Sequence, residues 1–231
     1  MLLEISSLNK QFNSIPFEER ITKLYDIFDE SDVLYTSSFG TSAVFLIFLI
    51  HKLRPTQKIH FIDTGYHFRE TLDYKSELKA CYNLNIETVD PDEYLHKYSL
   101  ENELWKDDPN LCCQVNKVEP LEVIKRDYKV WISGLMAVQS KTRKNLNIFE
   151  QQGEILKFYP LIDVTEEELA ACKEKYNLPE HPLLTQGYAS VGCTHCTIKG
   201  EDRSGRWSGK GKVECGLHFP IEAENRGYIE V

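Results

Sequence analysis

Strand-like and helix-like segments alternate along the first 135 residues of this 231-residue chain. Apolar residues recur at helical spacing in residues 17–30, 41–53 and 68–84, and short β-rich runs fall at residues 33–38, 58–65, 86–90 and 130–135. Strands separated by helices of this length usually pair in parallel, with helices covering both faces of the sheet. The order therefore predicts an α/β fold with a mostly parallel, twisted sheet. Ligands bind such sheets beyond the carboxyl ends of the strands.

Composition narrows the class of protein further. Hydrophobic residues make up 42% of the chain and charged residues 27%, as in folded proteins with a buried core. The longest apolar run, residues 43–50, is too short to span a bilayer, and the N-terminus has no signal-peptide pattern. With 36 acidic and 27 basic residues the formal net charge is −9, which argues against general nucleic-acid binding. We expect a cytoplasmic protein that binds neither membranes nor nucleic acid.

The C-terminal part differs from the rest. A last regular helix is expected over residues 165–177, with Thr165 as N-cap and Glu168 completing a capping box. After it, periodicity fades, and eight of the 12 glycines fall in the last 45 residues. Because glycine-rich sequence favours mobility over packing, we expect two parts: a nucleotide-binding α/β domain over residues 1–198 and a flexible segment over residues 199–231.

A turn rich in small polar residues follows the first predicted strand. Ser37, Ser38 and Gly40 lie between that strand and the next helix. Backbone N–H groups at a helix N-terminus attract anions, and serine hydroxyls add donors, so the turn is a candidate phosphate site. The alternative is that the serines only cap the helix. The turn has neither the Walker-loop pattern nor the G-x-G-x-x-G pattern of dinucleotide folds.

Four cysteines occur in two close pairs, Cys112 with Cys113 and Cys193 with Cys196. Four thiolates suit either a structural zinc ion or an iron–sulfur cluster, and spacing alone leaves both open. Adjacent cysteines favour the cluster, because zinc ligands are usually separated by two or more residues. A further alternative is that all four are ordinary buried thiols.

A single cysteine lies in the glycine-rich segment. Cys215 is next to Glu214 and three residues before His218. A thiol reacts as its thiolate, and the acidic and basic neighbours have opposing effects on its pKa. A nucleophile on a mobile segment could close over a substrate and then present its covalent product to a second protein. The remaining cysteines, Cys81 and Cys172, lie on amphipathic helices and are expected to be structural.

Basic residues are scattered through an otherwise acidic chain. Arginine binds phosphate and sulfate through paired N–H donors, so an anion site is expected to use several of them. Lys141 and Lys144 read as solvated surface residues. The candidates for anion binding are Lys117, Arg143, Arg203 and Arg206.

Taken together, these motifs resemble the adenylyl-sulfate and phosphoadenylyl-sulfate reductase family of assimilatory sulfate reduction. The resemblance runs through most of the chain, and its segments are SSFGTSAV, FIDTGYHFRET, CCQVNKVEPL, WISGL with QSKTR, YPLIDVTEEEL, LPEHPLLTQGYASVGCTHCT, RSGRW and KVECGLH. Related nucleotide enzymes such as sulfurylases and tRNA thiolases are expected to carry S-G-G-x-D-S where this chain has SSFGTS.

The resemblance implies a fold of the adenine-nucleotide α-hydrolase type (PP-loop/HUP) and a role for each candidate residue. Cys215 would be the nucleophile, attacking the sulfur of adenylyl sulfate (APS), expelling AMP and retaining a cysteine S-sulfonate that thioredoxin or glutaredoxin reduces to sulfite. Lys117 would lie between the cluster and the substrate. The implied [4Fe–4S] ligands are Cys112, Cys113, Cys193 and Cys196, and the implied substrate contacts are Ser37, Ser38, Gly40, Lys117, Arg143, Arg203, Arg206 and His218.

The chain departs from the family pattern at Met136 and Ala137, where many members have two basic residues. Arg143, Arg203 or another base is expected to compensate. The four-cysteine form goes with APS, while phosphoadenylyl sulfate (PAPS) reduction and dual use remain alternatives. Two other readings stay open: a sulfur transferase acting on RNA and a non-catalytic Cys₄ zinc module. The sequence does not indicate an oligomeric state.

Overall fold

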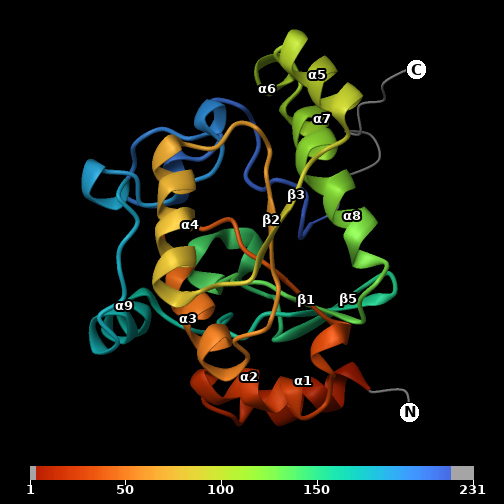
Figure 1. Cartoon of the computed structure of the whole chain (residues 1–231), viewed down its shortest axis with the longest axis vertical. Coiled ribbons are helices and arrows are strands. Elements are labelled where there is room, and N and C mark those ends of the chain that lie inside the picture. Colours follow the sequence, from red (N-terminus) through yellow and green to blue (C-terminus); the bar gives the residue numbers. More distant parts are fainter. Residues whose placement is uncertain (1–3, 220–231) are drawn as a thin grey trace.

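The computed structural model describes residues 4–219 of the chain (Figure 1). This part contains nine α-helices, none of which is long and apolar enough to cross a lipid bilayer. They are α1 (Ile5–Asn13), α2 (Phe17–Tyr25), α3 (Val44–Leu53), α4 (Arg69–Tyr82), α5 (Glu93–Glu101), α6 (Leu104–Asp107), α7 (Pro109–Cys113), α8 (Glu119–Lys125) and α9 (Glu166–Lys175).

The strands form one six-stranded sheet in the order β3-β2-β1-β4-β6-β5. All neighbouring pairs are parallel except β5 with β6, which form an antiparallel hairpin at one edge. The mostly parallel sheet confirms the prediction, whereas the hairpin was not predicted. The strands are β1 (Val33–Thr36), β2 (Ile59–Ile62), β3 (Ile86–Val89), β4 (Val130–Ile132), β5 (Phe149–Gln152) and β6 (Ile155–Phe158).

Helices cover both faces of the sheet. Successive residues of a strand point to opposite faces, so neighbouring residues pack against different helices. Tyr35 and Ile132 belong to the large core, in which α3 and α4 pack. Leu34 and Trp131, one residue earlier on the same strands, pack instead with Leu121 of α8. Figure 1 shows α3 and α4 on one side of the sheet and α8 on the other.

Local sequence explains where two of these helices begin and end. Helix α9 begins with the predicted capping box: the Thr165 hydroxyl accepts from the Glu168 amide, and the Glu168 carboxylate accepts from the Thr165 amide. Helix α4 ends at Asn83, which takes the left-handed conformation typical of a C-terminal cap. Helix α3 is buried along most of its length because α2 and α9 pack on it from outside.

The C-terminal segment has no regular helix or strand within residues 199–219, which pack against the body of the domain. Trp207 is 2% exposed, and its amide donates to the Cys196 carbonyl at 2.9 Å. The structure thus describes one position for residues 199–219. Residues 220–231 of the predicted segment lie outside the described residues, and both the division at residue 199 and the mobility remain predictions.

Candidate functional site

Two cavities meet at the carboxyl end of the sheet. The larger, about 500 Å³, is lined by the loops that follow β1 and β4, and the smaller is about 180 Å³. Strand β1 lies between β2 on one side and β4 on the other, so the chain first builds the sheet in one direction and then returns to build it in the other. Strand order reverses at this point, which is where open α/β sheets bind ligands.

The loop after β1 forms part of the wall of both cavities. Ser37 and Ser38 border both, and Gly40 borders the larger one. The loop is held by Phe39, which is fully buried and adopts a φ of 50°, while its amide donates to the Ser37 hydroxyl at 3.2 Å. Helix α3 begins only at Val44 and has no side-chain cap. The alternative in which these serines cap the helix is therefore wrong.

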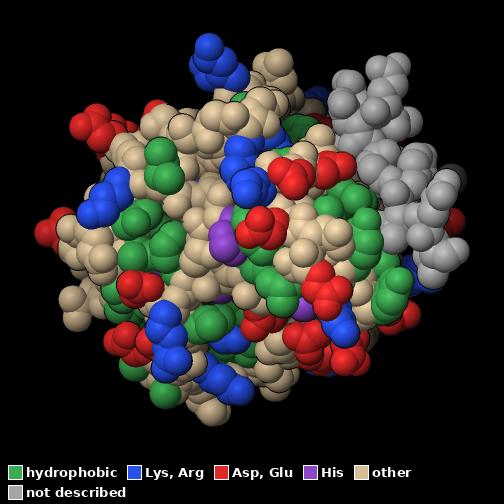
Figure 2. Space-filling view, turned by 90° about the horizontal axis from the view of Figure 1, so that it is seen from above, with side chains coloured by type: hydrophobic (Ala, Val, Ile, Leu, Met, Phe, Trp, Pro, Cys, Tyr) green, Lys and Arg blue, Asp and Glu red, His purple; other side chains and the backbone are tan. Residues whose placement is uncertain are grey.

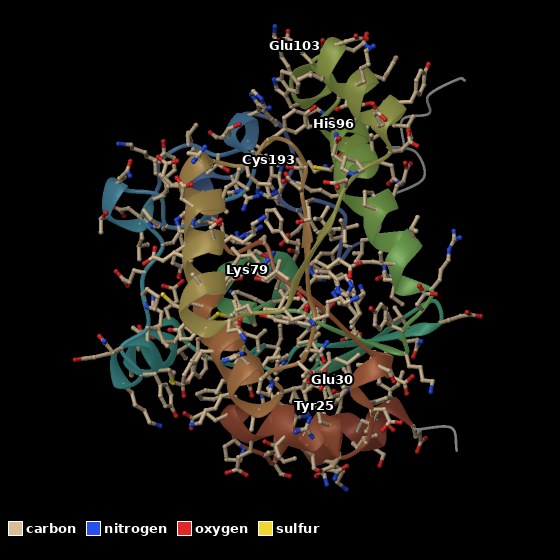
Figure 3. The ribbon with its side chains drawn as sticks, in the orientation of Figure 1. Tyr25, Glu30, Lys79, His96, Glu103 and Cys193 are labelled. Carbon is tan, nitrogen blue, oxygen red and sulfur yellow. The ribbon has the colours of Figure 1, made fainter. Side chains whose placement is uncertain are left out.

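The four paired cysteines are buried next to this wall. Cys112 and Cys113 end α7, and Cys193 and Cys196 flank a short turn after the last helix. Cys112, Cys193 and Cys196 share one apolar cluster, which Trp207 also joins. In Figure 3 the labelled Cys193 lies between α4 and the helices that contain the other pair. Residues about 80 positions apart in sequence are thus gathered in one place, while their role as cluster ligands remains a prediction.

The loop after β2 holds the Cys-x-x-C turn in position. The Thr194 amide donates to the Tyr66 carbonyl at 2.8 Å, and His67 forms an isolated bridge with Cys193. The Thr64 hydroxyl lies 3.4 Å from the Cys193 sulfur. The ring of His195, inside this turn, stacks on that of Trp105 with centroids 4.1 Å apart.

Polar groups surround the sulfur of Cys112 as well. The Asn116 amide lies 3.7 Å from it and the Ser99 hydroxyl 3.9 Å. Cys112 and Cys193 differ electrostatically. Burial raises the pKa of Cys112 to about 12. Burial alone would also raise the pKa of Cys193, but Lys117, the Thr64 hydroxyl and Arg206 together outweigh it and the pKa is lowered.

Lys117 owes its position to an irregular turn of helix. Residues Gln114–Val118 form a π turn, η2, between α7 and α8. Lys117 borders the smaller cavity. Burial pushes the pKa of Lys117 down, but its interactions with Cys193, Cys113 and Cys215 together outweigh this effect and raise it. The turn thus places a cation beside the cysteines at the smaller cavity, and its role between cluster and substrate remains a prediction.

The donor set of this site suits a cluster. Four buried cysteines, polar hydrogen-bond donors beside two of the sulfurs and an apolar surround are typical of iron–sulfur sites. Within residues 4–219, no group of three or more His, Cys, Asp or Glu side chains is arranged to hold a metal ion. A four-iron cluster takes four cysteine ligands, and these four buried cysteines match that number and ligand type.

Cys215 borders the smaller cavity together with Lys117 and Cys193. Its side chain is half-buried and packs against the apolar cluster around the cysteine pairs. All seven cysteines lie in the described part of the chain and all are free thiols. The predicted nucleophile therefore lies beside the predicted cluster ligands, in a cavity that shares part of its lining with the larger one.

Three arginines separate the two cavities. Arg143, Arg203 and Arg206 border both. The guanidinium of Arg206 donates to the Val191 carbonyl at 3.0 Å, while its buried Nε–H has no partner among the described residues. A Cβ at Gly192 would lie 2.1 Å from that guanidinium, so any larger residue there would displace the Arg206 side chain. The sequence thus brings together three of the basic residues that it predicted.

Glu214 holds two of these arginines. Its carboxylate accepts from Arg143 Nε and Nη2, both at 2.8 Å, and from Arg203 Nη2 at 3.2 Å. Burial alone would raise the pKa of Glu214, but the Arg143 donors outweigh it and the pKa is lowered. Burial, together with Arg143, lowers the pKa of Arg203 to about 10. Sequence reasoning treated Glu214 only as a neighbour of Cys215 and missed this contact.

His218 closes the other end of the smaller cavity. Its ring stacks on Trp131 with centroids 4.6 Å apart, and its Nε2 lies 3.2 Å from the Ser133 hydroxyl. Its carbonyl accepts from Lys157 at 2.6 Å. Burial and the cations around it hold the pKa of His218 well below its usual value, so the ring is neutral. Because His218 borders both cavities, it stays a candidate for substrate contact.

The two positions that lack the family's basic residues lie in or beside the wall of the larger cavity. Met136 is buried and lines this cavity, and Ala137 follows it in a short helical turn. Arg143 and Lys173 line the same cavity. These two cations are close enough in space to supply the charge that Met136 does not.

Other residues of the site were not singled out from sequence. Thr64, Tyr66 and His67 belong to a quoted motif, but no role followed from it. Their place directly after β2 is the signal that could have identified them, since the carboxyl ends of neighbouring parallel strands meet at one edge. Trp131 and Trp207 gave no signal, because buried tryptophans are common in any core.

Comparisons with known proteins agree with this geometry. Residues 32–199 match the family model described as the phosphoadenosine phosphosulfate reductase domain. The chain is 39% identical over 203 residues to the adenosine 5′-phosphosulfate reductase of Bacillus cereus (strain AH187), covering 82% of this chain and 85% of that protein. It is 41% identical over 197 residues to the corresponding protein of Lysinibacillus sphaericus (strain C3-41), covering 81% and 84%.

Solved structures support the fold. The crystal structure of a phosphoadenylyl-sulfate reductase from Candida auris, a phosphate complex, has a TM-score of 0.73 and 24% identity, covering 86% of this chain and 99% of that chain. The FMN adenylyltransferase of Candida glabrata has a TM-score of 0.61 and 13% identity, covering 84% and 65%. Both share the nucleotide-binding α/β architecture that the sequence predicted.

Proposed function

Because the chain belongs to the phosphoadenosine phosphosulfate reductase family, we propose that it reduces adenosine 5′-phosphosulfate (APS) to sulfite and AMP. The chain covers most of the length of relatives that carry the name adenosine 5′-phosphosulfate reductase. The observation that carries the proposal is the arrangement at the smaller cavity, where a free thiol, a lysine and three arginines converge beside a larger cavity at the strand ends.

The first half of the reaction uses Cys215 as nucleophile. With the nucleotide in the larger cavity, the Cys215 thiolate attacks the sulfur of APS, an S–S bond forms, and the bond from sulfur to the bridging oxygen breaks. The electron pair of that bond leaves on the phosphate of AMP. Guanidinium groups stabilise this developing charge, and Arg203 and Arg206 border both cavities. The product is a cysteine S-sulfonate on the enzyme.

The second half needs a dithiol, which thioredoxin or glutaredoxin would supply. One partner thiolate attacks the Cys215 sulfur, sulfite leaves with the electron pair, and a mixed disulfide remains. The second partner thiol resolves it, so Cys215 is restored and the partner is oxidised. The half-exposed position of Cys215 on an irregular segment suits delivery to a second protein. We infer a cytoplasmic location, because thioredoxin and glutathione keep that compartment reducing.

We further propose that Cys112, Cys113, Cys193 and Cys196 hold a [4Fe–4S] cluster. Bound there, the cluster would supply a polarisable charge beside Lys117 and a structural link between α7 and the Cys-x-x-C turn. Lys117 itself would orient the sulfate end of the nucleotide toward Cys215, because its ammonium borders the cavity in which Cys215 lies. PAPS, which differs by a 3′-phosphate, is the alternative substrate.

The test is incubation of the purified enzyme with APS or PAPS in the absence of reductant, followed by intact-mass measurement. APS is expected to add one sulfonate to the wild type and to Cys81→Ser, a control that removes an exposed thiol. Cys215→Ser is expected to add none while retaining nucleotide binding and brown colour. Thioredoxin should then release sulfite from the wild-type adduct.

Three results would contradict these proposals. An adduct on Cys215→Ser would exclude this nucleophile, and adduct formation with PAPS alone would reverse the choice of substrate. A colourless protein with stoichiometric zinc and no acid-labile sulfide would exclude the cluster and favour the zinc module.

A further inference from the structure

We propose that Glu214 is a positioning residue, which couples docking of the segment that carries Cys215 to the alignment of Arg143 and Arg203. The proposal rests on the function proposed above, since it assumes that Cys215 is the nucleophile and that the arginines receive an anion. It adds that the nucleophile and the anion site are assembled together, through a single carboxylate.

The contacts of Glu214 are unusual for a residue in an irregular segment. Its side chain is 9% exposed and forms ion pairs with both arginines. The hydroxyls of Ser140 and Thr142 donate to the same carboxylate at 3.0 and 3.2 Å. All of these partners except Arg203 come from the loop after β4, more than 70 positions away in sequence. Docking of the segment therefore places this carboxylate among donors that come mostly from the loop after β4.

The carboxylate approaches the arginines from the side of the smaller cavity. Glu214 borders that cavity but not the larger one, whereas both arginines border both. Arg143 uses three of its five N–H donors, two toward Glu214 and one toward Gln139. The other two N–H groups have no partner within residues 4–219 and can donate to a ligand. Glu214 can thus fix the plane of this guanidinium without occupying every donor that an oxyanion would use.

Charge explains why the arginines need such a partner. Arg143, Arg203 and Arg206 border the same cavities, and burial, with repulsion from Arg143 as the next cause, lowers the pKa of Arg203. A buried carboxylate between two guanidinium groups offsets that repulsion. If Glu214 were absent, the two guanidinium groups would lower their free energy by turning toward solvent. They would then point away from the phosphate and sulfate that they are proposed to bind.

Chain connectivity links this contact to the chemistry. Cys215 follows Glu214 directly, so its Cα lies only about 3.8 Å from that of Glu214. Seating the carboxylate therefore fixes the backbone of the nucleophile. Two neighbouring contacts of the segment are not ion pairs. The Lys212 ammonium donates to the uncharged Asn110 side chain at 2.8 Å, and the His218 ring is neutral.

A competing explanation is that Glu214 blocks the anion site and must leave before substrate binds. The two explanations make opposite predictions for removal of the negative charge. If Glu214 blocks, its loss frees the arginines and a nucleotide binds more tightly. If Glu214 positions, its loss leaves nucleotide affinity unchanged or weaker, exposes Cys215 and slows the transfer of the sulfonate.

The experiment compares full-length wild type, Glu214→Gln and Glu18→Gln, each loaded with the same cofactor. Glu18→Gln is the matched control, because it removes the carboxylate of a surface ion pair with Lys175, far from the site. Three quantities are measured: the rate of Cys215 alkylation by iodoacetamide, mapped by peptide mass; the single-turnover rate of S-sulfonate formation; and the affinity for AMP.

For Glu214→Gln we expect Cys215 alkylation to rise and single-turnover S-sulfonate formation to fall, each on the order of tenfold, with AMP bound no more tightly. The control should match the wild type. Ser140→Ala removes one donor to Glu214 and should shift both rates in the same directions by about threefold. This milder variant keeps the test valid if Glu214→Gln folds poorly.

Unchanged alkylation and turnover in Glu214→Gln would overturn the proposal, and tighter AMP binding would establish the blocking role instead. These failures are distinct from failure of the proposed function. If the wild type itself forms no S-sulfonate with either nucleotide, the function is wrong. If the wild type forms it and Glu214→Gln forms it equally fast, only the positioning role is wrong.

Discussion

The sheet domain and the C-terminal segment are held by different kinds of contact. In the sheet domain, Phe149 and Phe158 are fully buried and packed among other aromatic rings. Around Cys215, Glu214 and His218 contact the body through ion pairs, one stacked ring and a few hydrogen bonds, while Trp207 of the same segment is buried in the apolar cluster around the cysteine pairs. Apolar burial sets the stability of the domain, whereas a few polar contacts set the position of the nucleophile. Stability and reactivity can therefore be changed separately.

The largest difference between the effect on stability and the effect on Cys215 reactivity is expected from a core substitution in the sheet domain. Phe149 is fully buried, with the rings of Phe12 and Phe158 each 4.8 Å away. Phe149→Ala should lower the free energy of unfolding by about 4 kcal/mol because it leaves a cavity. Urea unfolding measures this, while Cys215 alkylation under native conditions should stay within about twofold of wild type.

Val123→Ala is the control for this core substitution, because Val123 is 60% exposed on α8 and should change stability by less than about 0.5 kcal/mol. Equal losses in the free energy of unfolding for Phe149→Ala and Val123→Ala would show that apolar burial does not dominate the stability of the domain. A large rise in Cys215 alkylation in Phe149→Ala would show that the two regions are not separable.

A smaller effect is expected from pH. His181 is fully buried, its Nε2 lies 3.1 Å from the Thr71 hydroxyl, and burial lowers its pKa to about 4. In the unfolded chain His181 takes up a proton near pH 6.5, whereas in the folded chain it stays neutral until the pH approaches 4. The contribution of this group to the free energy of unfolding is therefore full above pH 6.5 and falls as the pH drops toward 4. Between pH 7 and pH 5 this single group should remove about 2 kcal/mol.

Urea unfolding at the two pH values measures this loss. In His181→Gln the difference between pH 7 and pH 5 should shrink by that amount, even though the variant is less stable at both. The same slope in wild type and His181→Gln would show that other groups, and not this buried imidazole, carry the acid sensitivity.

The smallest effect on stability is expected in the segment. His218→Ala removes the ring stacked on Trp131 and the contact with the Ser133 hydroxyl. The free energy of unfolding should fall by less than about 1 kcal/mol. Alkylation of Cys215 should rise about fivefold, and the tryptophan emission should change because Trp131 loses its neighbour. A loss of stability as large as that of Phe149→Ala would place the segment within the core of the domain.

Sequence patterns predicted the sheet domain well because they are local. The periodicity of α3 and the apolar runs of β1 and β2 reflect burial of each element by itself. The hairpin of β5 and β6 escaped prediction because its strands are short and lie outside the alternating order. The capping box at Thr165 was found because all of its groups lie within four residues.

The site was predicted in its residues but not in its contacts. Motifs pointed to the cysteines and arginines, and the structure brings them to one end of the sheet. The pairing of Glu214 with Arg143 spans 71 positions, and no local pattern reports such a distance. Sequence reasoning weighed Glu214 only against the pKa of Cys215, whereas tertiary structure directs its carboxylate to the guanidinium groups.

The end of the molecule that contains the site carries charges of both signs. Figure 2, which views this end from above, shows basic and acidic side chains interspersed on the surface. The cations that matter are instead concentrated in the walls of the cavities. An acidic chain can therefore bind an anionic nucleotide without a broad basic surface, and its binding should depend less on salt than a surface patch would.

The π turn at Gln114–Val118 has a consequence for how this chain can change. A π turn accommodates one residue more than an α turn does, so the helical faces before and after it are offset by about 100° relative to a continuous α-helix. Deleting any one residue of the turn would restore ordinary helix and swing Cys112 and Cys113 away from Lys117 and α8. Apart from Lys117 and Asn116, whose side chains contact the site, residues of the turn can be substituted as long as the new side chains fit the packing. The length of the turn cannot change, so this short stretch should resist insertion and deletion more strictly than the loops around it.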